Sequence, residues 1–292
     1  MIVILGLIVV IVGVLGGFVL AGGPLFVLIQ LPEFIIMGAA AIGSLLIGTP
    51  FWLLKRLPSK IGQLLKGDPY TQEVYLNLLQ TMYELFLVSD RSGLMSIEQH
   101  VEEPNTSSIF KKNGFLISHK TFLNYISDTL KLTISGGVSE QELEYLLDAD
   151  IETHHEEMSG FSTTLSKVGD ALPGLGIVAA VLGIIITMGS IGGSPESVGE
   201  KVAAALVGTF IGVLASYGFV SPIANGLEFN SQSEQRYMMC IKTGIVAYTK
   251  GNGAVISTEI ARRAIYSHVK PSFQELEEAC HKIRTGMKTL TV

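Results

Sequence analysis

The sequence predicts an all-α polytopic membrane protein with four transmembrane helices and a helical cytoplasmic domain. The mean hydropathy of +0.46 is high for a chain of 292 residues, yet 16% of the residues are charged. These charges fall in definite blocks, which are separated by apolar segments of about 20 residues, the length of a membrane-spanning helix. The cytoplasmic domain is expected to combine the loop between spans two and three with the C-terminal tail.

The first two spans are expected within residues 1–54. The first 32 residues contain no charged side chain, whereas a secretory signal normally opens with Lys or Arg, so residues 2–20 are interpreted as a retained span. Its glycines would let neighbouring helices approach closely. The second span is predicted over 34–54. Because Lys55, Arg56 and Lys60 follow it, the positive-inside rule places its end in the cytoplasm.

Residues 55–170 are polar and are predicted to form cytoplasmic helices. Asp68-Pro69 is interpreted as a helix start, and apolar residues then recur at helical spacing. Gly93 interrupts this helix, and a second helix is predicted over 119–132. Ser139 and Glu142 have the spacing of a capping box that opens a third, long helix. The run His154-His155-Glu156-Glu157 in that helix is interpreted as a solvated acidic face rather than a metal site.

The third and fourth spans are predicted within 171–222. Residues 171–191 and 202–222 each contain 21 residues without Asp, Glu, Lys, Arg or His, which corresponds to roughly 31 Å of helix. Both runs are rich in Gly and Ala. Pro173 and Pro222 lie near their matching ends, where each is either a boundary residue or a hinge at which a missing hydrogen bond permits bending.

Residues 223–292 are predicted to form cytoplasmic C-terminal helices, and Ser272 with Glu275 forms a second capping box. An even number of spans then places both termini in the cytoplasm. Of the segments between the spans, only 21–33 and 192–200 are expected on the outer side. Cys240 and Cys280 are expected to be free thiols. A net charge of −6 gives no indication of nucleic-acid binding, and the sequence contains no nucleotide loop, nucleophile triad or metal spacing, so an enzyme is not expected.

A proton path through lipid normally needs an ionisable side chain at depth. The four predicted spans contain none, and Asp170 lies at the cytoplasmic edge. The polar groups expected at depth are hydroxyls, which do not titrate near neutral pH. They are Ser44, Thr187, Ser190, Thr209, Ser216 and Tyr217. If ions cross here, the titrating carboxylate is therefore expected to come from another chain.

The third and fourth spans and the short link between them form a predicted hairpin. Two long motifs in this hairpin closely resemble the MotA family of flagellar motor stator subunits. They are DALPGLGIVAAVLG at 170–183 and ALVGTFIGVLASYGFVSP at 205–222, and the resemblance extends to KPSFQELEE at 270–278. It implies a multi-pass protein of the bacterial inner membrane, without a cofactor, in which five subunits surround a MotB dimer. The membrane Asp of MotB carries the proton, and the cytoplasmic domain pushes on the rotor protein FliG.

The resemblance also implies roles for single residues. Pro173 and Pro222 would couple the proton step to motion of the cytoplasmic domain, and Thr209 would lie on the ion path, with Tyr217 and Asp170 as further candidates in the hairpin. Sodium-driven relatives such as PomA carry Thr at the position of Ala180. Because Ala offers no oxygen to replace the water shell of a sodium ion, protons are favoured.

The rotor contact of the family uses an Arg and a Glu separated by eight residues, with Gly five before the Glu. Gly93 and Glu98 fit this pattern, but Asp90 occupies the position of the Arg, and Arg91 comes one residue later. On a helix this shift turns the side chain by about 100°. Glu98 and Arg91 are thus predicted rotor contacts, with two solvated surface charges as the alternative.

Three other functions are possible. An ExbB/TolQ-type energiser shares the proton path with a partner, but its three spans do not fit the two spans before residue 55. A self-sufficient channel or transporter would be expected to carry charges at depth or inverted repeats, and neither is found. A structural scaffold explains the packing, but not the concentration of Thr209, Tyr217 and two prolines in one hairpin.

Overall fold

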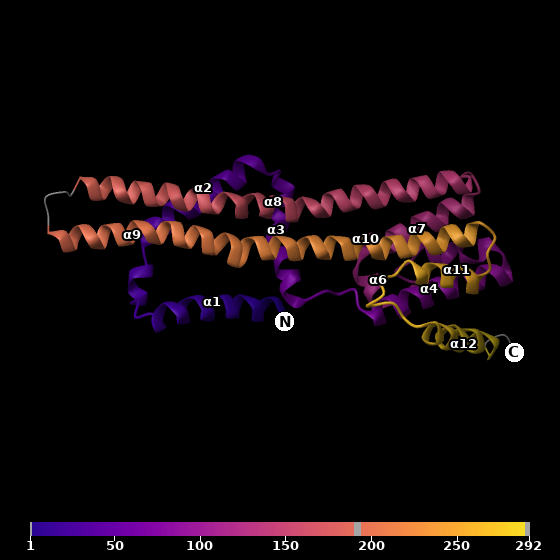
Figure 1. Ribbon diagram of the computed structural model, residues 1–292. Helices are drawn as coiled ribbons and strands as arrows, with labels where there is room; N and C mark the ends of the chain where they lie inside the picture. Colours follow the sequence, from indigo (N-terminus) through magenta and orange to yellow (C-terminus); the bar gives the residue numbers. More distant parts are fainter. Residues whose placement is uncertain (1, 190–193, 290–292) are drawn as a thin grey trace. The chain divides into compact units, whose positions relative to one another are not determined.

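The computed structural model describes residues 2–189 and 194–289, and every regular element in these ranges is a helix (Figure 1). Among the described residues, four helical segments are long and apolar enough to cross a membrane, which agrees with the predicted fold class. They lie within Ile2–Leu20, Leu25–Gly48, Glu140–Met188 and Val198–Thr249. Ser190, one of the hydroxyls expected at depth, lies outside the described residues.

The chain divides into two compact units. Unit 1 comprises residues 1–67 and 157–231, and unit 2 comprises residues 68–156 and 232–292. Helices α8 (Glu140–Met188) and α10 (Ser221–Thr249) contribute residues to both units. The expected division at residues 55, 170 and 223 therefore differs from the compact units, because the long helices do not end at the predicted membrane boundaries.

Unit 1 contains the apolar helices. In order, they are α1 (Ile2–Leu20), η1 (Leu25–Leu28), α2 (Leu31–Gly48), α3 (Phe51–Lys66), the last part of α8, α9 (Pro195–Leu214), η4 (Ala215–Val220) and the first part of α10. Helix α2 ends six residues before the predicted end of span two. Thr49 is extended, with φ −127° and ψ 132°, because the following Pro50 disfavours the helical conformation.

Residues 51–66 form the separate amphipathic helix α3 instead of completing span two. Its buried face carries Leu53, Leu57 and Leu64, which form a small core with Phe161 of α8 and Leu227 of α10. Trp52 packs edge-on against Phe161, with 6.0 Å between the ring centroids. Lys55, Arg56 and Lys60 therefore lie on this packed helix rather than on a flexible loop after the span.

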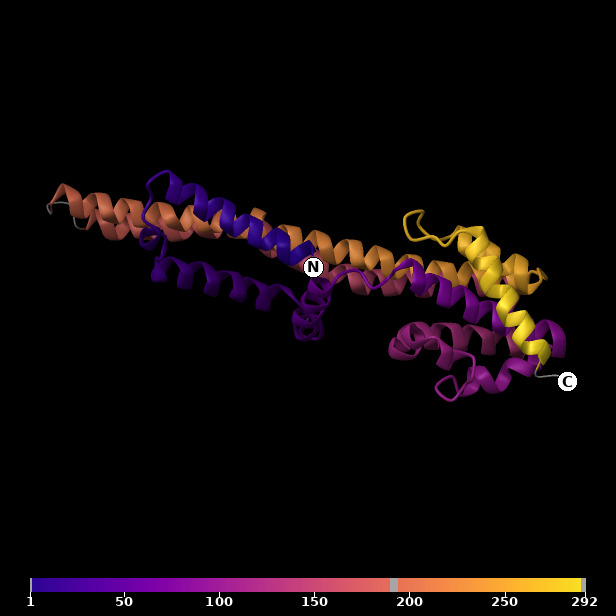
Figure 2. The same ribbon diagram turned by 90° about the horizontal axis from the view of Figure 1, so that it is seen from below.

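Unit 2 has a larger core that is built around α4 (Gln72–Ser92). The other elements are η2 (Leu94–Ile97), α5 (Glu98–Glu102), η3 (Phe110–Lys112), α6 (Gly114–Ser118), α7 (Lys120–Ser135), α11 (Ala254–Arg263), α12 (Phe273–Thr289), the start of α8 and the end of α10. Helices α11 and α12 pack on α4 (Figure 2). Leu78, Leu85 and Phe86 of the predicted apolar face are fully buried.

Most local signals in unit 2 form as predicted. Both capping boxes are present: Ser139 N–H donates to Glu142 Oε2 at 2.9 Å, and Ser272 N–H donates to Glu275 Oε2 at 2.6 Å. The start at Asp68-Pro69 is wrong. Helix α4 begins at Gln72 with Thr71 as N-cap. Asp68 instead accepts the N–H of Tyr70 at 2.9 Å, because its short side chain closes a local turn.

The predicted solvated acidic face on α8 is present at Glu156 and Glu157, which are exposed, but not at His154. The His154 side chain is only 13% exposed, and its Nε2 lies 2.9 Å from Glu234 Oε1 of α10, so this position is a packed contact rather than a solvated face. No cluster of three or more metal-ligating side chains occurs in the described ranges. Cys240 and Cys280 are both free, as predicted, and both are buried. Burial raises the pKa of Cys280 to about 12, which keeps this thiol protonated.

Candidate functional site

The hairpin of α8 and α9 is packed backbone against backbone. An added Cβ atom at Gly176 would lie 2.7 Å from the carbonyl oxygen of Gly208 and 3.2 Å from Gly212 Cα. One at Gly212 would lie 2.6 Å from the carbonyl oxygen of Leu172. Real side chains do not tolerate such distances from backbone atoms. The small-residue faces of the two runs therefore meet directly, which is how helices pack closely in lipid.

Pro173 lies inside α8, one turn before this close contact. It has no N–H to donate to the carbonyl of Gly169, so α8 lacks one hydrogen bond there. Gly169 faces the end of η4, since an added Cβ atom would lie 2.8 Å from Ser221 Oγ and 3.4 Å from Val220 Cγ1. The weak point of α8 is thus in contact with the residue that precedes Pro222.

The fourth span contains an irregularity at the same level. Residues Ala215–Val220 form the π-helical segment η4, in which Ser221 N–H donates to the carbonyl of Ser216, five residues earlier. In a regular α-helix the ring of Pro222 would clash with the carbonyl of Gly218. The wider π turn relieves this clash, and π segments occur often at functional sites. Sequence reasoning identified Pro222 but not the π segment.

The structure brings Ala180 and Thr209 to one level of the hairpin. Ala180 is buried, Thr209 is half-buried, and both flank Gly208, whose added Cβ atom would lie 3.3 Å from Ala180 N. Tyr217 and Asp170 are placed differently. The Tyr217 side chain is 69% exposed in this chain, and Asp170 is also exposed. Only Ala180 and Thr209 therefore share the packed level of the two helices.

Glu33 was missed by the sequence reasoning. It was assigned to the short outer segment 21–33, but it lies in the first turn of α2, and its residue is only 6% exposed. Its carboxylate lies between α8 and α9, against Gly183 and Gly208. The expectation that no span carries an ionisable group is therefore wrong. Pro32 followed by an acid is a helix-start signal that could have placed Glu33 on the helix.

The predicted rotor contacts lie in unit 2, at the turn after α4. Arg91 lies in the last turn of α4, Gly93 has φ +83°, and Glu98 begins α5. A positive φ favours glycine, so this position fixes the turn between the two charges. Both Arg91 and Glu98 are exposed. The structure thus presents the two charges to solvent on either side of one rigid turn.

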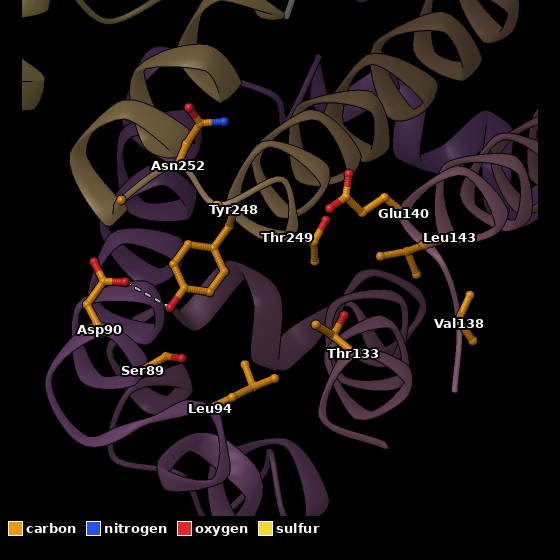
Figure 3. A pocket seen from close by; sticks show the side chains of 12 residues that line it. Ser89, Asp90, Leu94, Thr133, Val138, Glu140, Leu143, Tyr248, Thr249 and Asn252 are labelled. Atoms are coloured by element: carbon orange, nitrogen blue, oxygen red, sulfur yellow. Dashed lines mark hydrogen bonds between the residues drawn. The ribbon is translucent and has the colours of Figure 1, made fainter. Parts of the chain in front are cut away.

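Asp90, which replaces the Arg of the family pattern, has a structural role. Its Oδ1 accepts the Tyr248 hydroxyl at 2.9 Å, and its Oδ2 accepts the N–H of Ala254 at 3.0 Å, which caps α11. Figure 3 shows Tyr248 pointing to Asp90 at the edge of a cavity of about 450 Å³. Burial is the main cause that raises the pKa of Tyr248, so the hydroxyl stays a donor. Asp90 therefore links the C-terminal end of α4 to the start of α11.

Two family models match the sequence. Motility protein A N-terminal matches residues 4–93, and the MotA/TolQ/ExbB proton channel family matches residues 117–239. Motility protein A of Salmonella typhimurium is 37% identical, over 97% of this chain and 96% of that protein. Motility protein A of Escherichia coli is 36% identical, over 100% of this chain and 99% of that protein.

A solved structure has the same fold. The structure of C. jejuni MotAB superposes with a TM-score of 0.76 at 18% sequence identity, covering 93% of this chain and 98% of that one. The N-terminal model covers the region of the first two spans, which an ExbB/TolQ-type energiser is not expected to share. The chain therefore belongs to the Motility protein A family, within the MotA/TolQ/ExbB proton channel family.

Proposed function

We propose that this chain is a flagellar motor stator subunit, not an enzyme, which couples proton flow across the bacterial inner membrane to torque on the rotor protein FliG. The observation that carries this proposal is the meeting of two helix irregularities in a glycine-packed hairpin. Pro173 interrupts the hydrogen bonding of α8, η4 widens the helix before Pro222, and Gly169 contacts Ser221 between them.

Motion can pass from this hairpin because its helices are long. A bend at Pro173 costs no hydrogen bond, since the Gly169 carbonyl has no helical donor. A π segment can shift its extra residue along the helix with little change in hydrogen-bond number. Helices α8 and α10 both continue as helix past the boundary between units 1 and 2. A change of bend in the hairpin therefore displaces residues of unit 2.

The partner is a MotB-type protein, which supplies a membrane Asp, and five copies of this chain surround a MotB dimer. Support comes from the solved MotAB relative and from helix α1, which has no buried residue in this chain. Added Cβ atoms at Gly6, Gly13 and Gly16 would meet nothing within 4 Å. Such a face is suited to close contact with another helix.

The driving ion is the proton. Ala180 is buried beside Thr209, and it provides no side-chain oxygen to a dehydrated cation. Glu98 and Arg91 meet oppositely charged groups of FliG at the turn around Gly93. Both are exposed, and neither forms an ion pair in the described ranges. Binding of these two charges to the rotor therefore does not require an ion pair within the described residues to be broken.

The test is complementation in a motile host that lacks its own stator. This chain, expressed with its candidate MotB, is expected to restore rotation, and the two proteins are expected to purify together as a five-to-two complex. Motor speed is expected to fall with a protonophore and to ignore removal of sodium. Failure of co-purification and rotation would contradict the stator assignment, and speed that follows external sodium would contradict the proton assignment.

A further inference from the structure

Glu33 lies in a niche made by glycines between α8 and α9. An added Cβ atom at Gly208 would lie 2.6 Å from Glu33 Oε2, and one at Gly183 would lie 3.2 Å from Glu33 Oε1. A larger side chain at Gly208 would therefore require the Glu33 carboxyl group to move from its position. The fourth and third spans thus both leave space for a single acid from the second span.

This carboxyl group is buried without a full set of partners. Glu33 is 94% buried, and its Oε2 has no hydrogen-bond partner in the part of the chain that the structure describes. A charged carboxylate in such a place is costly, because no donor among the described residues compensates for the lost solvation of Oε2. An acid that only stabilised the fold would be expected to have its oxygens paired.

The niche is at the depth of the ion-path residues. Gly183 comes ten residues after Pro173, and Gly208 comes fourteen residues before Pro222, which corresponds to about 15 Å and about 21 Å of helix. Both glycines belong to the apolar runs, so the carboxyl group lies among membrane-spanning segments rather than in a loop. Gly208 also separates Glu33 from Ala180 and precedes Thr209.

We propose that Glu33 is a proton-binding group of this chain, on the outer half of the ion path. The inference rests on the proposed function of the chain. The carboxylate takes one proton from water at the outer side and becomes a neutral acid. It then gives that proton to water or to the partner's carboxylate and becomes an anion again. Each cycle therefore moves one proton, and the exchange needs no other reactant.

The surroundings of the niche favour a proton over a metal cation. Besides Glu33, the atoms nearest the Cβ positions of the two glycines belong to Ala180 and Ala205, which have no titratable or oxygen-bearing side chain. Thr187, one turn further along α8, donates its hydroxyl to the carbonyl of Gly183 at 2.8 Å. A sodium ion needs several oxygen ligands in place of its water shell, and one carboxyl group cannot supply them. A proton needs only one oxygen.

The test compares Glu33→Gln with Glu33→Asp in the complex with MotB, in the complementation host. Gln keeps the shape and packing of a protonated Glu but cannot carry a proton. Glu33→Gln is expected to lower motor speed by about tenfold or more, because a positioned proton carrier is lost. The complex is expected to be recovered at the native level. Glu33→Asp is expected to regain part of the speed, with a dependence on external pH that differs from that of the native motor.

A matched control is Glu196→Gln in the first turn of α9, where the acid is exposed; native speed is expected. Native speed with Glu33→Gln would overturn the proposal, as would loss of the complex in that variant, since the carboxyl group would then be structural. Rotation with the unaltered chain distinguishes a failure of this proposal from a failure of the proposed function. If the unaltered chain does not rotate the motor at all, the stator assignment fails rather than the role of Glu33.

Discussion

Each of the two units of this chain is stabilised internally by a different kind of packing. Unit 2 buries large side chains, among them Phe86, Phe122 and Tyr237, in one continuous core. The hairpin of unit 1 is joined by glycine backbones, and most of its long apolar side chains are exposed in this chain. In water, burial of apolar area drives packing. In lipid it does not, so close contact between backbones takes its place.

The difference has a functional consequence. A core of interlocked aromatic rings resists deformation, because each ring fills space that no neighbour can leave empty. Two helices that touch through glycines can slide or bend over one another without displacing side chains. Unit 2 is therefore suited to transmit force, and the hairpin is suited to change shape.

The largest expected effect is in the core of unit 2. Phe86 is fully buried and stacks on Tyr248, with ring centroids 4.3 Å apart. Phe86→Ala is expected to lower the free energy of unfolding by about 3–5 kcal/mol, because it leaves a cavity. Thermal unfolding of the detergent-solubilised protein measures this. Tyr145→Ala is the control, since Tyr145 is 74% exposed in the same unit; an equal loss from both would contradict the described core.

A smaller effect is expected where the hairpin helices touch. Gly212→Ala would place a Cβ atom 2.6 Å from the carbonyl oxygen of Leu172, so the helices must separate. The expected destabilisation is about 1–3 kcal/mol, the usual cost of overpacking. Gly6→Ala in α1 meets nothing within 4 Å and is expected to leave the melting temperature of the isolated chain unchanged. If Gly212→Ala is equally neutral, the backbone contact is absent.

The N-cap of α4 contributes less. Thr71 Oγ1 accepts the N–H of Val74 at 3.4 Å, a long hydrogen bond. Thr71→Ala is therefore expected to cost about 0.5–1 kcal/mol in the free energy of unfolding, at the low end for an N-cap. Thr71→Ser keeps the oxygen and is expected to match the native protein. A loss with Ser as large as that with Ala would exclude the capping role.

The smallest effect is a pH dependence of unit 2. The Ser139 side chain and then its backbone N–H lower the pKa of Glu142, and the backbone N–H of Ser272 is the main cause that lowers the pKa of Glu275. Both carboxylates thus add stability above their unfolded pKa of about 4.5, which is lost as the pH falls through the folded value. Melting temperatures of native protein and Glu142→Gln should converge in acid. Parallel curves would contradict this.

The sequence predicted what depends on neighbouring residues. The four apolar segments, both capping boxes and the break at Gly93 follow from local patterns, and each is present in the structure. The early end of α2 also had a local signal in Pro50, which the hydropathy of residues 49–54 obscured. Local patterns thus predict that these helices are present, whereas the start at Asp68-Pro69 and the end of span two were misplaced by several residues.

Contacts between distant residues could not be predicted in this way. His154 pairs with Glu234, 80 residues later, and Asp90 caps a helix that begins at Ala254. The burial of Glu33 depends on a niche that exists only once the third and fourth spans are packed. The π segment before Pro222 depends on how the fourth span adapts to the proline ring. Each arises from tertiary packing, and no periodicity in the sequence records it.

The most direct test of the proposed hinge is Pro173→Ala in the complementation host, because restoring the missing N–H closes the bond to Gly169 and removes the hinge. Pro58→Ala is the matched control, since Pro58 also lies inside a helix of unit 1 but outside the hairpin. Rotation is measured in both, together with the amount of complex in the membrane. Pro173→Ala is expected to assemble normally and to stop rotation, whereas Pro58→Ala is expected to rotate. Normal rotation with Pro173→Ala would contradict the proposed hinge.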